Sequence, residues 1–463
     1  MKNLLLFNIA LLWMSSDLKA QIIASGCMSS SSYFLCSTFG SPMACGYNAF
    51  GELGNEINPT YNIPINVNGL SGIIAISGGQ NYSLFLKNDG NIWACGDNSS
   101  GQLGIGSATI SSTPIKLNGL SGVTAVSAGE RHSLFLKNNG TVWACGYNEY
   151  GQLGDGTNTN KNLPSQVNGL SGITAISAGR YHSLFLKNDG SVWACGYNFF
   201  GGLGDGTVID RNIPVQVNGL SSIKAIGAGE WHSLFLKNDG SVWACGYNGT
   251  YIDNKISVQV IGLSGITAIG AGARVSLFLK NDGSVWACGN NSAGQLGDGT
   301  NTSKGSPVLV SGLSGITAIA AGHSHSIFLK NDGSVWTCGN NSAGQLGDGS
   351  FTHMNLPVQT ILIVNGQCTS LVSIGSEVSN DFSKLKIFPN PAKDFITIET
   401  IGNMPQRKVK IFSNTAQEVF QSSFSDYRIN HSLNIDISTL SPGIYFIRFL
   451  DEGRQVNGKF VKD

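Results

Sequence analysis

The sequence predicts an all-β protein: a seven-bladed β-propeller followed by a small C-terminal β-sandwich. The first observation behind this prediction is a Cys-Gly pair that recurs with cysteines at Cys45, Cys95, Cys145, Cys195, Cys245, Cys288 and Cys338. Subtracting neighbouring positions gives intervals of 50, 50, 50, 50, 43 and 50 residues. The second is composition, since 61 glycines and only 12% charged residues are typical of a β protein dense in turns. Seven copies of this length fit a propeller with one four-stranded sheet per blade.

Residues 1–20 are expected to be a signal peptide. Lys2 gives a positive start, an apolar stretch runs from Leu4 to Trp13, and Ala20 precedes a cleavage position at Gln21. The stretch is shorter than the roughly 20 apolar residues that span a bilayer, and no later segment reaches that length. A buried N-terminal strand is the alternative. The signal predicts an exported protein without a transmembrane segment.

Each copy of the repeat contains four short strand-like runs. In one copy, Ser183–Lys187 and Ser191–Cys195 are rich in aromatic and aliphatic residues, and Asn188-Asp-Gly190 between them is a hairpin turn. Pro214–Val217 and, in front of them, Ile173–Ile176 are the other two strands. Because one blade alone leaves its sheet faces exposed, the copies are expected to stack and close into a ring.

Three motifs of the repeat carry a resemblance to a known family. They are Gly-x-x-His-Ser at Gly179–Ser183, Gly-Ser-Val-Trp at Gly190–Trp193 and Gly-Gln-Leu-Gly-Asp-Gly at Gly151–Gly156. The predicted propeller, residues 21–366, resembles the regulator of chromosome condensation repeat family. This resemblance implies the same propeller fold.

The chain departs from the family pattern in three places. Cysteine stands before the glycine where the family usually has tryptophan. The copy between Cys245 and Cys288 lacks the Gly-x-Leu-Gly-Asp-Gly turn, which accounts for its seven missing residues (50 − 43). In the first copy Gly40 matches Gly190, and Ser32 is placed at the position of His182.

Two expectations concern ring closure and the cysteines. The strand near Ile22–Ala24 and the late run Leu356–Ile363 are expected to meet in one sheet. The seven cysteines in register are predicted to be small buried thiols, since equivalent points on neighbouring blades lie beyond disulfide reach. Outside that register, a Cys27–Cys368 bridge is a hypothesis, and the state of Cys36 is open.

The C-terminal region is predicted to be a separate module. A Ser-rich linker, residues 367–383, precedes a segment of alternating strand patterns at 384–463, which fits a small β-sandwich. Phe388-Pro-Asn-Pro391 and Ile437–Tyr445 resemble the sorting domain of the type IX secretion system of Bacteroidota. The resemblance implies the type IX secretion machinery as a partner, and a protein that is secreted or attached to the outer cell surface. A β-sandwich binding domain is the alternative.

Composition and motifs argue against several functions. With 28 basic and 28 acidic residues the net charge is zero, so no nucleic-acid partner is expected. No nucleophile elbow, zinc motif or phosphate loop is present, and we predict no catalytic residue, no metal and no cofactor. The repeated histidines His132, His182, His232 and His325 are interpreted as structural. The Asp-Gly turns are likewise interpreted as turns rather than calcium loops.

The copies differ from one another mainly in two loops, and these are the candidate partner-binding positions. Aromatic and arginine side chains on loops of a rigid scaffold are common anchors of recognition. The candidate residues are Arg131, Tyr147, Tyr150, Arg180, Tyr181, Phe199, Phe200, Trp231 and Arg274. The sequence thus favours an exported, monomeric module, not an enzyme, that binds an extracellular protein or glycan. An extracellular enzyme with a site in the central opening, and a structural surface or adhesion component, are the alternatives.

Overall fold

The structure is a computed structural model in which the chain divides into two compact units, Met1–Leu362 and Ile363–Asp463. It describes residues 22–36, 41–56, 60–249, 254–361, 363–364, 367–368, 386–388, 393–399, 407–413, 418–424, 432–451 and 454–462. The expected signal peptide lies outside these residues, as does almost all of the expected linker. The predicted boundaries at 366 and 383 stay predictions.

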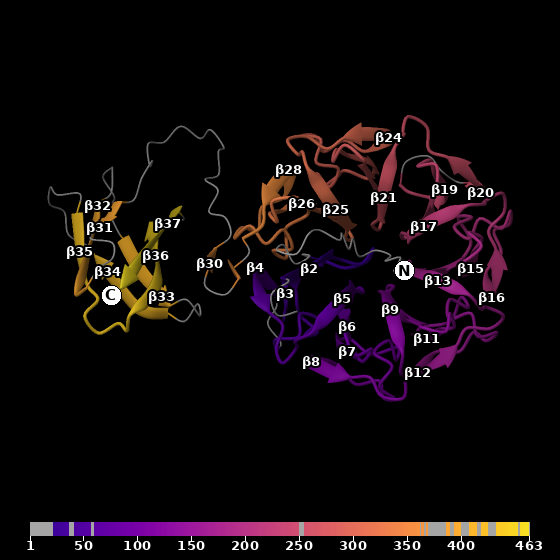
Figure 1. Cartoon of the computed structure of the whole chain (residues 1–463), viewed down its shortest axis with the longest axis horizontal. Helices are drawn as coiled ribbons and strands as arrows, with labels where there is room; N and C mark the ends of the chain where they lie inside the picture. Colours follow the sequence, from indigo (N-terminus) through magenta and orange to yellow (C-terminus); the bar gives the residue numbers. More distant parts are fainter. Residues whose placement is uncertain are drawn as a thin grey trace, which may run out of the picture. The chain divides into compact units, whose positions relative to one another are not determined.

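The first unit is a ring of seven four-stranded antiparallel sheets that follow one another in chain order (Figure 1). The strands of the first four blades are β1 Ile22–Ala24, β2 Ser31–Cys36, β3 Ser41–Tyr47, β4 Thr60–Asn66, β5 Ile73–Gly78, β6 Tyr82–Lys87, β7 Ile92–Gly96, β8 Ser111–Lys116, β9 Val123–Ala128, β10 His132–Lys137, β11 Val142–Gly146, β12 Lys161–Gln166, β13 Ile173–Ala178, β14 His182–Lys187, β15 Val192–Gly196 and β16 Arg211–Gln216. Those of the last three are β17 Ile223–Ala228, β18 Trp231–Lys237, β19 Val242–Tyr247, β20 Asn254–Gln259, β21 Ile266–Ala271, β22 Val275–Lys280, β23 Val285–Gly289, β24 Lys304–Leu309, β25 Ile316–Ala321, β26 His325–Lys330, β27 Val335–Gly339 and β28 Met354–Gln359. The predicted all-β, seven-bladed propeller is confirmed, and the described residues contain no helix.

The hairpin at the centre of each blade forms for a local reason. In the fourth blade β14 pairs with β15, with Leu186 opposite Val192. Gly190 takes a φ of 79°, a left-handed conformation that glycine adopts without strain. The Asp189 carboxylate accepts a hydrogen bond from the Ser191 amide at 2.8 Å, which fixes the turn.

The hydrophobic core lies between blades. Phe185 of β14 is fully buried in a cluster with Leu134 of the third blade and Leu153 from the turn that follows β11. Equivalent, fully buried rings are Phe85, Phe135, Phe235, Phe278 and Phe328. Burying one such ring is worth roughly 1.5–3 kcal/mol, so each blade is stabilised mainly by its neighbour.

The expected closure by a shared sheet is wrong. β1 pairs with β2 in the first blade, and β28 pairs with β27 in the last. Every blade is one uninterrupted stretch of chain, so the ring closes by packing the first blade against the last. The Asn62 amide side chain donates to the Gly349 carbonyl at 2.7 Å, and the Gly349 amide donates to the Asn62 carbonyl at 2.9 Å.

The expected alignment of the first copy is also wrong by one residue. Ser31 lies opposite Gly46 and Ser32 opposite Cys45, whereas His182 lies opposite Gly196. Ser31, not Ser32, therefore occupies the histidine position. The reason is a central hairpin one residue longer than in the other blades.

A short segment after β1 fills the middle of the ring. The Cys27 thiol lies 3.8 Å from the Ala178 carbonyl on the fourth blade, and the Ser29 carbonyl accepts from the His323 amide on the seventh at 2.9 Å. Gly26 passes so close to Gly78 that an added Cβ would lie 1.5 Å from its carbonyl oxygen. The remaining axial cavity has a volume of about 20 Å³, room for about one water. Residues 25–29 thus lie at the ring axis, where the enzymatic alternative places a site.

The second unit contains short strands in three sheets. They are β29 Ile363–Val364, β30 Gln367–Cys368, β31 Lys386–Phe388, β32 Phe395–Glu399, β33 Arg407–Ser413, β34 Glu418–Phe424, β35 Ser432–Asp436, β36 Gly443–Asp451 and β37 Arg454–Lys462. The orders are β29-β30, β31-β32-β35 and β34-β33-β36-β37. Ile396, Ile411 and Ile435 are buried. The β-sandwich itself remains a prediction for this unit.

Candidate functional site

The strand order places two loops of every blade on the same end of the ring. We call the connection between the first and second strands the first loop, and the connection between the third and fourth strands the third loop. In the fourth blade these are residues 179–181 and 197–210. Because successive strands are antiparallel, both loops leave the sheet at one end, opposite to the Asp-Gly hairpin turns. All nine predicted partner-binding residues lie on this end, which we call the loop face.

Buried histidines under the loop face join neighbouring blades. Nε2 of His182 lies 3.1 Å from the hydroxyl of Ser233, and that hydroxyl donates to the Gly202 carbonyl at 2.6 Å. Since the hydroxyl hydrogen is used by the carbonyl, the imidazole Nε2–H must be the donor to the serine. The contact recurs at 2.9–3.1 Å in the pairs His132–Ser183, His232–Ser276 and His325–Ser32.

These histidines are held neutral. Burial lowers the pKa of His132, His182 and His325 to about 3 and that of His232 to about 4. The motif glycine is needed because an added Cβ on Gly179 would lie 2.4 Å from Cε1 of His182. The geometry gives each imidazole a structural hydrogen bond between blades, as the sequence interpretation held.

The cysteines in register are free and buried, which confirms their interpretation as small thiols. The Cys195 thiol donates to the Gln152 carbonyl of the preceding blade at 3.5 Å, and burial raises its pKa. Cys27 is also a free, buried thiol, so the Cys27–Cys368 bridge is not formed. The side chains of Cys36 and Cys368 lie outside the described residues.

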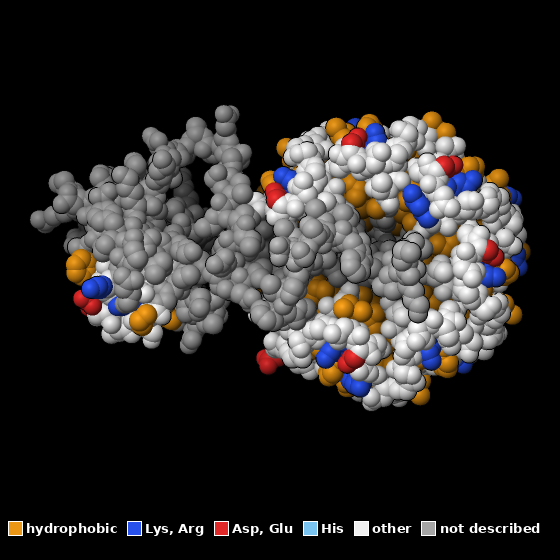
Figure 2. Space-filling view, viewed as in Figure 1, with side chains coloured by type: hydrophobic (Ala, Val, Ile, Leu, Met, Phe, Trp, Pro, Cys, Tyr) orange, Lys and Arg blue, Asp and Glu red, His pale blue; other side chains and the backbone are white. Residues whose placement is uncertain are grey.

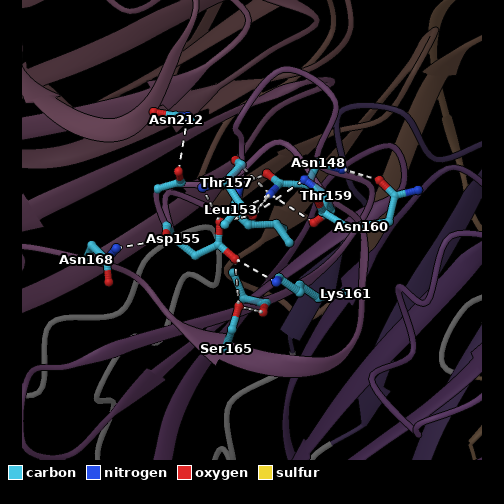
Figure 3. A network of polar contacts seen from close by, with 12 residues as sticks. Asn148, Leu153, Asp155, Thr157, Thr159, Asn160, Lys161, Ser165, Asn168 and Asn212 are labelled. Atoms are coloured by element: carbon cyan, nitrogen blue, oxygen red, sulfur yellow. Dashed lines mark hydrogen bonds and ion pairs between the residues drawn. The ribbon is translucent and has the colours of Figure 1, made fainter.

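A polar network fixes the shape of each long third loop (Figure 3). In the third blade the buried Asn148 side chain donates to the Thr157 carbonyl at 3.1 Å and accepts from the Leu153 amide at 2.9 Å. Asp155 accepts from the Thr157 amide at 2.9 Å and pairs with Lys161 at 3.6 Å. The carboxylate of this Asp-Gly-Thr turn is thus engaged in bracing the loop.

The loop face carries a continuous group of aromatic rings from the third to the fifth blade. We call it the aromatic cluster, and it consists of Tyr147, Tyr150, Tyr181, Tyr197, Phe199, Phe200, Trp231 and Tyr247. Tyr181, from the first loop of the fourth blade, and Trp231, the first residue of β18, have ring centroids 5.9 Å apart at 56°. Tyr197 links them, since its centroid is 5.1 Å from that of Trp231 and 6.4 Å from that of Tyr181. Most rings are half-buried against one another, but Phe199 is 63% exposed.

An ion network lies beside the aromatic cluster. Arg180 pairs with Glu130 of the third blade and Glu230 of the fifth, each at 2.5 Å. Its guanidinium lies 4.9 Å from the Tyr181 ring centroid and 4.7 Å from that of Trp231. Both glutamate side chains are only 5% exposed. The network therefore ties three blades together at the base of the cluster.

Most of the predicted residues come together. Tyr147, Tyr150, Tyr181, Phe199, Phe200 and Trp231 are in the cluster, Arg180 contacts it, and Arg274 joins the network through Glu230 at 2.6 Å. Arg131 is exposed and takes no part in these ring contacts or ion pairs.

Sequence reasoning left four contributors outside its candidate set. Tyr197 and Tyr247 were passed over although each follows a repeated Cys-Gly pair. Glu130 and Glu230 were left out because only aromatic and arginine side chains were selected as candidates. A usable signal was present: Glu130, Arg180 and Glu230 occupy one repeat position in three successive copies, in alternating charge.

On the face that Figure 2 shows, acidic and basic side chains lie in small mixed groups and form no large block of one sign. This agrees with a net charge of zero. No helix long and apolar enough to cross a membrane occurs among the described residues.

Comparison with known families decides the assignment. A family model described as the RCC1-like domain matches residues 10–253 and again 126–383. The chain belongs to the RCC1-like domain family. A second model, the secretion system C-terminal sorting domain, matches residues 386–463 of this RCC1-like protein. The sorting domain is a type IX secretion signal of Bacteroidota, so the protein is exported and either attached to the outer surface or released.

Solved structures share the fold of the RCC1-like ring. Human WBSCR16 is 20% identical, with a TM-score of 0.63 over 70% of this chain and 94% of that one. Yeast RCC1 (Prp20), solved in complex with Kap60, is 22% identical, with a TM-score of 0.64 over 71% of this chain and 86% of that one. No curated protein matches the sequence. At these identities the likeness concerns the fold alone.

Proposed function

We propose that this RCC1-like protein is an exported binding module that recognises an extracellular protein or glycan through the aromatic cluster. The sorting domain delivers it to the outer surface or the medium, and the propeller holds the loops rigid. The observation that carries the proposal is the concentration of eight rings on three adjacent blades, with Arg180 among them.

The same loop positions on other blades support this reading. After Cys-Gly, the sixth and seventh blades carry Asn290-Asn-Ser-Ala293 and Asn340-Asn-Ser-Ala343. These loops are built on the same scaffold, so the fold does not require aromatic rings there. Tyrosine and tryptophan are enriched among the residues that dominate binding energy. The ring-rich blades are therefore the side on which we place recognition.

Affinity capture on the immobilised full chain tests the proposal. Proteins and polysaccharides from the surroundings of the organism are offered to the parent chain and to a Tyr181→Ala/Trp231→Ala variant. We expect a ligand that the parent retains and the variant loses, because truncating a central anchor costs about 2 kcal/mol or more, roughly 30-fold in affinity.

Phe351→Ala is the matched control. Phe351 is 52% exposed on the third loop of the seventh blade, away from the aromatic cluster, and its removal should leave capture unchanged. Thermal unfolding of each variant shows whether the ring is intact. Capture of nothing, or equal capture by all three chains, would contradict the proposal and favour a structural surface component.

A further inference from the structure

The residues directly before the histidine position in four successive blades form an ordered arc on the loop face. Their backbones occupy equivalent places, because Arg131, Tyr181 and Arg274 accept amide hydrogen bonds from Tyr147, Tyr197 and Asn290 at 2.8–2.9 Å. Trp231 lies opposite Tyr247 in the same register. From the third blade to the sixth the arc therefore reads Arg131, Tyr181, Trp231, Arg274. We call it the outer arc.

The residues one position earlier in the third, fourth and fifth blades form a paired inner set. Glu130, Arg180 and Glu230 carry a net charge of −1 (1 − 2), which Arg274 balances through its contact with Glu230, and Tyr181 donates its hydroxyl hydrogen to Glu130 at 2.7 Å. This position lies close to the ring axis, since His323, the equivalent residue of the seventh blade, donates its amide hydrogen to the Ser29 carbonyl of the axial segment at 2.9 Å. The polar atoms of the three side chains in this set contact one another and the rings of Tyr181 and Trp231, and so hold these two rings in place.

The guanidinium groups at the two ends of the outer arc have hydrogen-bond donors that no described residue uses. Arg131 is exposed and outside the ion network. The Arg274 side chain is 47% exposed, and its contact with Glu230 is made through Nε. The guanidinium Nη groups of Arg274 and the whole guanidinium of Arg131 are thus available to an incoming anionic group, on either side of the central rings.

The surroundings favour a protein over a glycan. Sugar hydroxyls need several free amide, carboxylate or guanidinium groups around a flat ring face. Here Asn148 and Asn198 are buried and used to brace their own loops, the buried carboxylates are paired, and the exposed Glu149 carboxylate accepts from the Tyr147 hydroxyl at 2.6 Å. Tyr181, Trp231 and the adjoining Tyr150 and Tyr197 are inclined to one another by 43–74° and offer no common flat face, and the nearly parallel pair Phe200–Tyr247, at 28°, lies to one side of them. A contoured apolar centre with charged edges is the usual form of a protein interface.

We propose that the partner is a protein segment with one large apolar or aromatic side chain flanked on both sides by carboxylates. The apolar side chain packs against Tyr181 and Trp231, and the carboxylates pair with Arg131 and Arg274. This inference rests on the proposed function and narrows it to one class of ligand. Bidentate pairing with carboxylates at a desolvated edge is the geometry for which arginine is suited.

Selection of a random peptide display library on the immobilised full chain tests the inference. We expect enrichment of sequences in which Trp, Phe, Tyr or Leu has Asp or Glu within a few residues on each side. On an Arg131→Ala/Arg274→Ala variant, the acidic flanks should disappear from the enriched set while the apolar residue remains. A soluble peptide of the enriched sequence should bind that variant about tenfold more weakly or worse.

The matched control removes two cations from the opposite end of the ring. Lys187→Ala/Lys237→Ala should change the enriched sequences and the peptide affinity by less than about twofold, because those lysines flank the hairpin turns. Neutral or basic flanks, or acidic flanks that persist on the double arginine variant, would overturn the inference. So would the absence of any enriched sequence.

A parallel arm separates this inference from the proposed function. The same chains are tested for retention of neutral and acidic oligosaccharides. Retention that depends on Tyr181 and Trp231 would overturn the protein-segment inference and leave the proposed function standing. If neither peptides nor oligosaccharides bind in a way that depends on these two residues, both the protein-segment inference and the proposed function are contradicted.

Discussion

Nε2 of His325 in the last blade lies 2.9 Å from the hydroxyl of Ser32 in the first. Ser32 also donates to the Gln345 carbonyl at 2.6 Å. We call the boundary between two neighbouring blades a seam. The seam between the last and first blades therefore repeats the histidine–serine–carbonyl contact found at the other seams. The ring closes with the same chemistry that joins its other blades. This explains how it can close without sharing a strand between its ends.

The seam serines should differ in importance according to their partners. Ser183→Ala and Ser32→Ala each remove two buried hydrogen bonds, one to histidine and one to a carbonyl, and should each lower the free energy of unfolding by roughly 2–3 kcal/mol. Ser326→Ala removes only the bond to Gln295, because Val275 stands at the histidine position, and should cost about 1 kcal/mol. Urea unfolding of the three variants measures this. Equal costs would show that the histidines do not stabilise the seams.

Stability should fall on mild acidification. The four seam histidines have pKa values of about 3–4 in the ring but titrate near 6.5 when unfolded, so between these values the unfolded chain binds more protons. Each histidine then contributes a loss of about 1.4 kcal/mol per pH unit as the pH drops below 6.5. Burial raises the pKa of Glu52 to about 7. The contribution of Glu52 to the free energy of unfolding therefore changes with pH in the opposite direction and cancels that of about one histidine.

A single replacement isolates this effect. His182→Val copies the residue that occupies this position as Val275, and it should reduce the pH slope of unfolding free energy between pH 6.5 and 4.5 by about 1.4 kcal/mol per unit. Urea unfolding at several pH values provides the slope. An unchanged slope would mean that His182 is not held neutral in the native ring.

Arg180 should be far more important to stability than Arg274. Arg180→Ala would leave Glu130 and Glu230, each 5% exposed, without their shared cation, at a cost of about 3 kcal/mol. Arg274 is 47% exposed, so Arg274→Ala should cost less than about 1 kcal/mol. Chemical unfolding compares the two. If the double variant Arg180→Ala/Glu230→Gln regains most of the lost free energy of unfolding, repulsion between the two buried glutamates is the cause.

The fold was predictable from sequence because each blade is a local unit. Repeat spacing, Asp-Gly turns and alternating strands all act within about 50 residues, as the hairpin at Gly190 illustrates. Ring closure was not predictable, because the Ser32–His325 contact joins residues far apart in sequence. An extra residue in the first hairpin also shifted the expected alignment.

The candidate site was predictable in its exposed part only. Variation between copies identified Tyr181, Trp231 and Phe199, since loop residues that the fold does not need are free to differ. It passed over Glu130 and Glu230, because their role depends on pairing with Arg180 across two blade boundaries. The alternating charge of Glu130, Arg180 and Glu230 at one repeat position indicates this pairing only when successive copies are aligned with one another.

The short fifth blade should leave one thiol less protected. Where the third loop has its full turn, cysteines of the next blade such as Cys195 are 0% exposed and donate to a turn carbonyl. Cys288 follows the blade that lacks this turn and is 4% exposed. Timed alkylation of the native protein with mass spectrometry should modify Cys288 before Cys245. Equal rates would indicate that labelling reports global unfolding.

Loop bracing and binding should be separable by comparing two equivalent asparagines. Asn148 and Asn341 are both fully buried and make the same contacts in the third loops of the third and seventh blades, including hydrogen bonds from the Leu153 and Leu346 amides. Replacement of either by Ala should cost roughly 2–4 kcal/mol, since several buried backbone groups lose their partner.

Only the third-blade loop carries rings of the aromatic cluster, Tyr147 and Tyr150. Asn148→Ala should therefore weaken ligand capture as well as stability, while Asn341→Ala should lower stability alone. Capture assays at a temperature where both variants are folded separate the two effects. Equal loss of capture in both variants would place recognition outside the aromatic cluster, since the seventh-blade loop lies away from it.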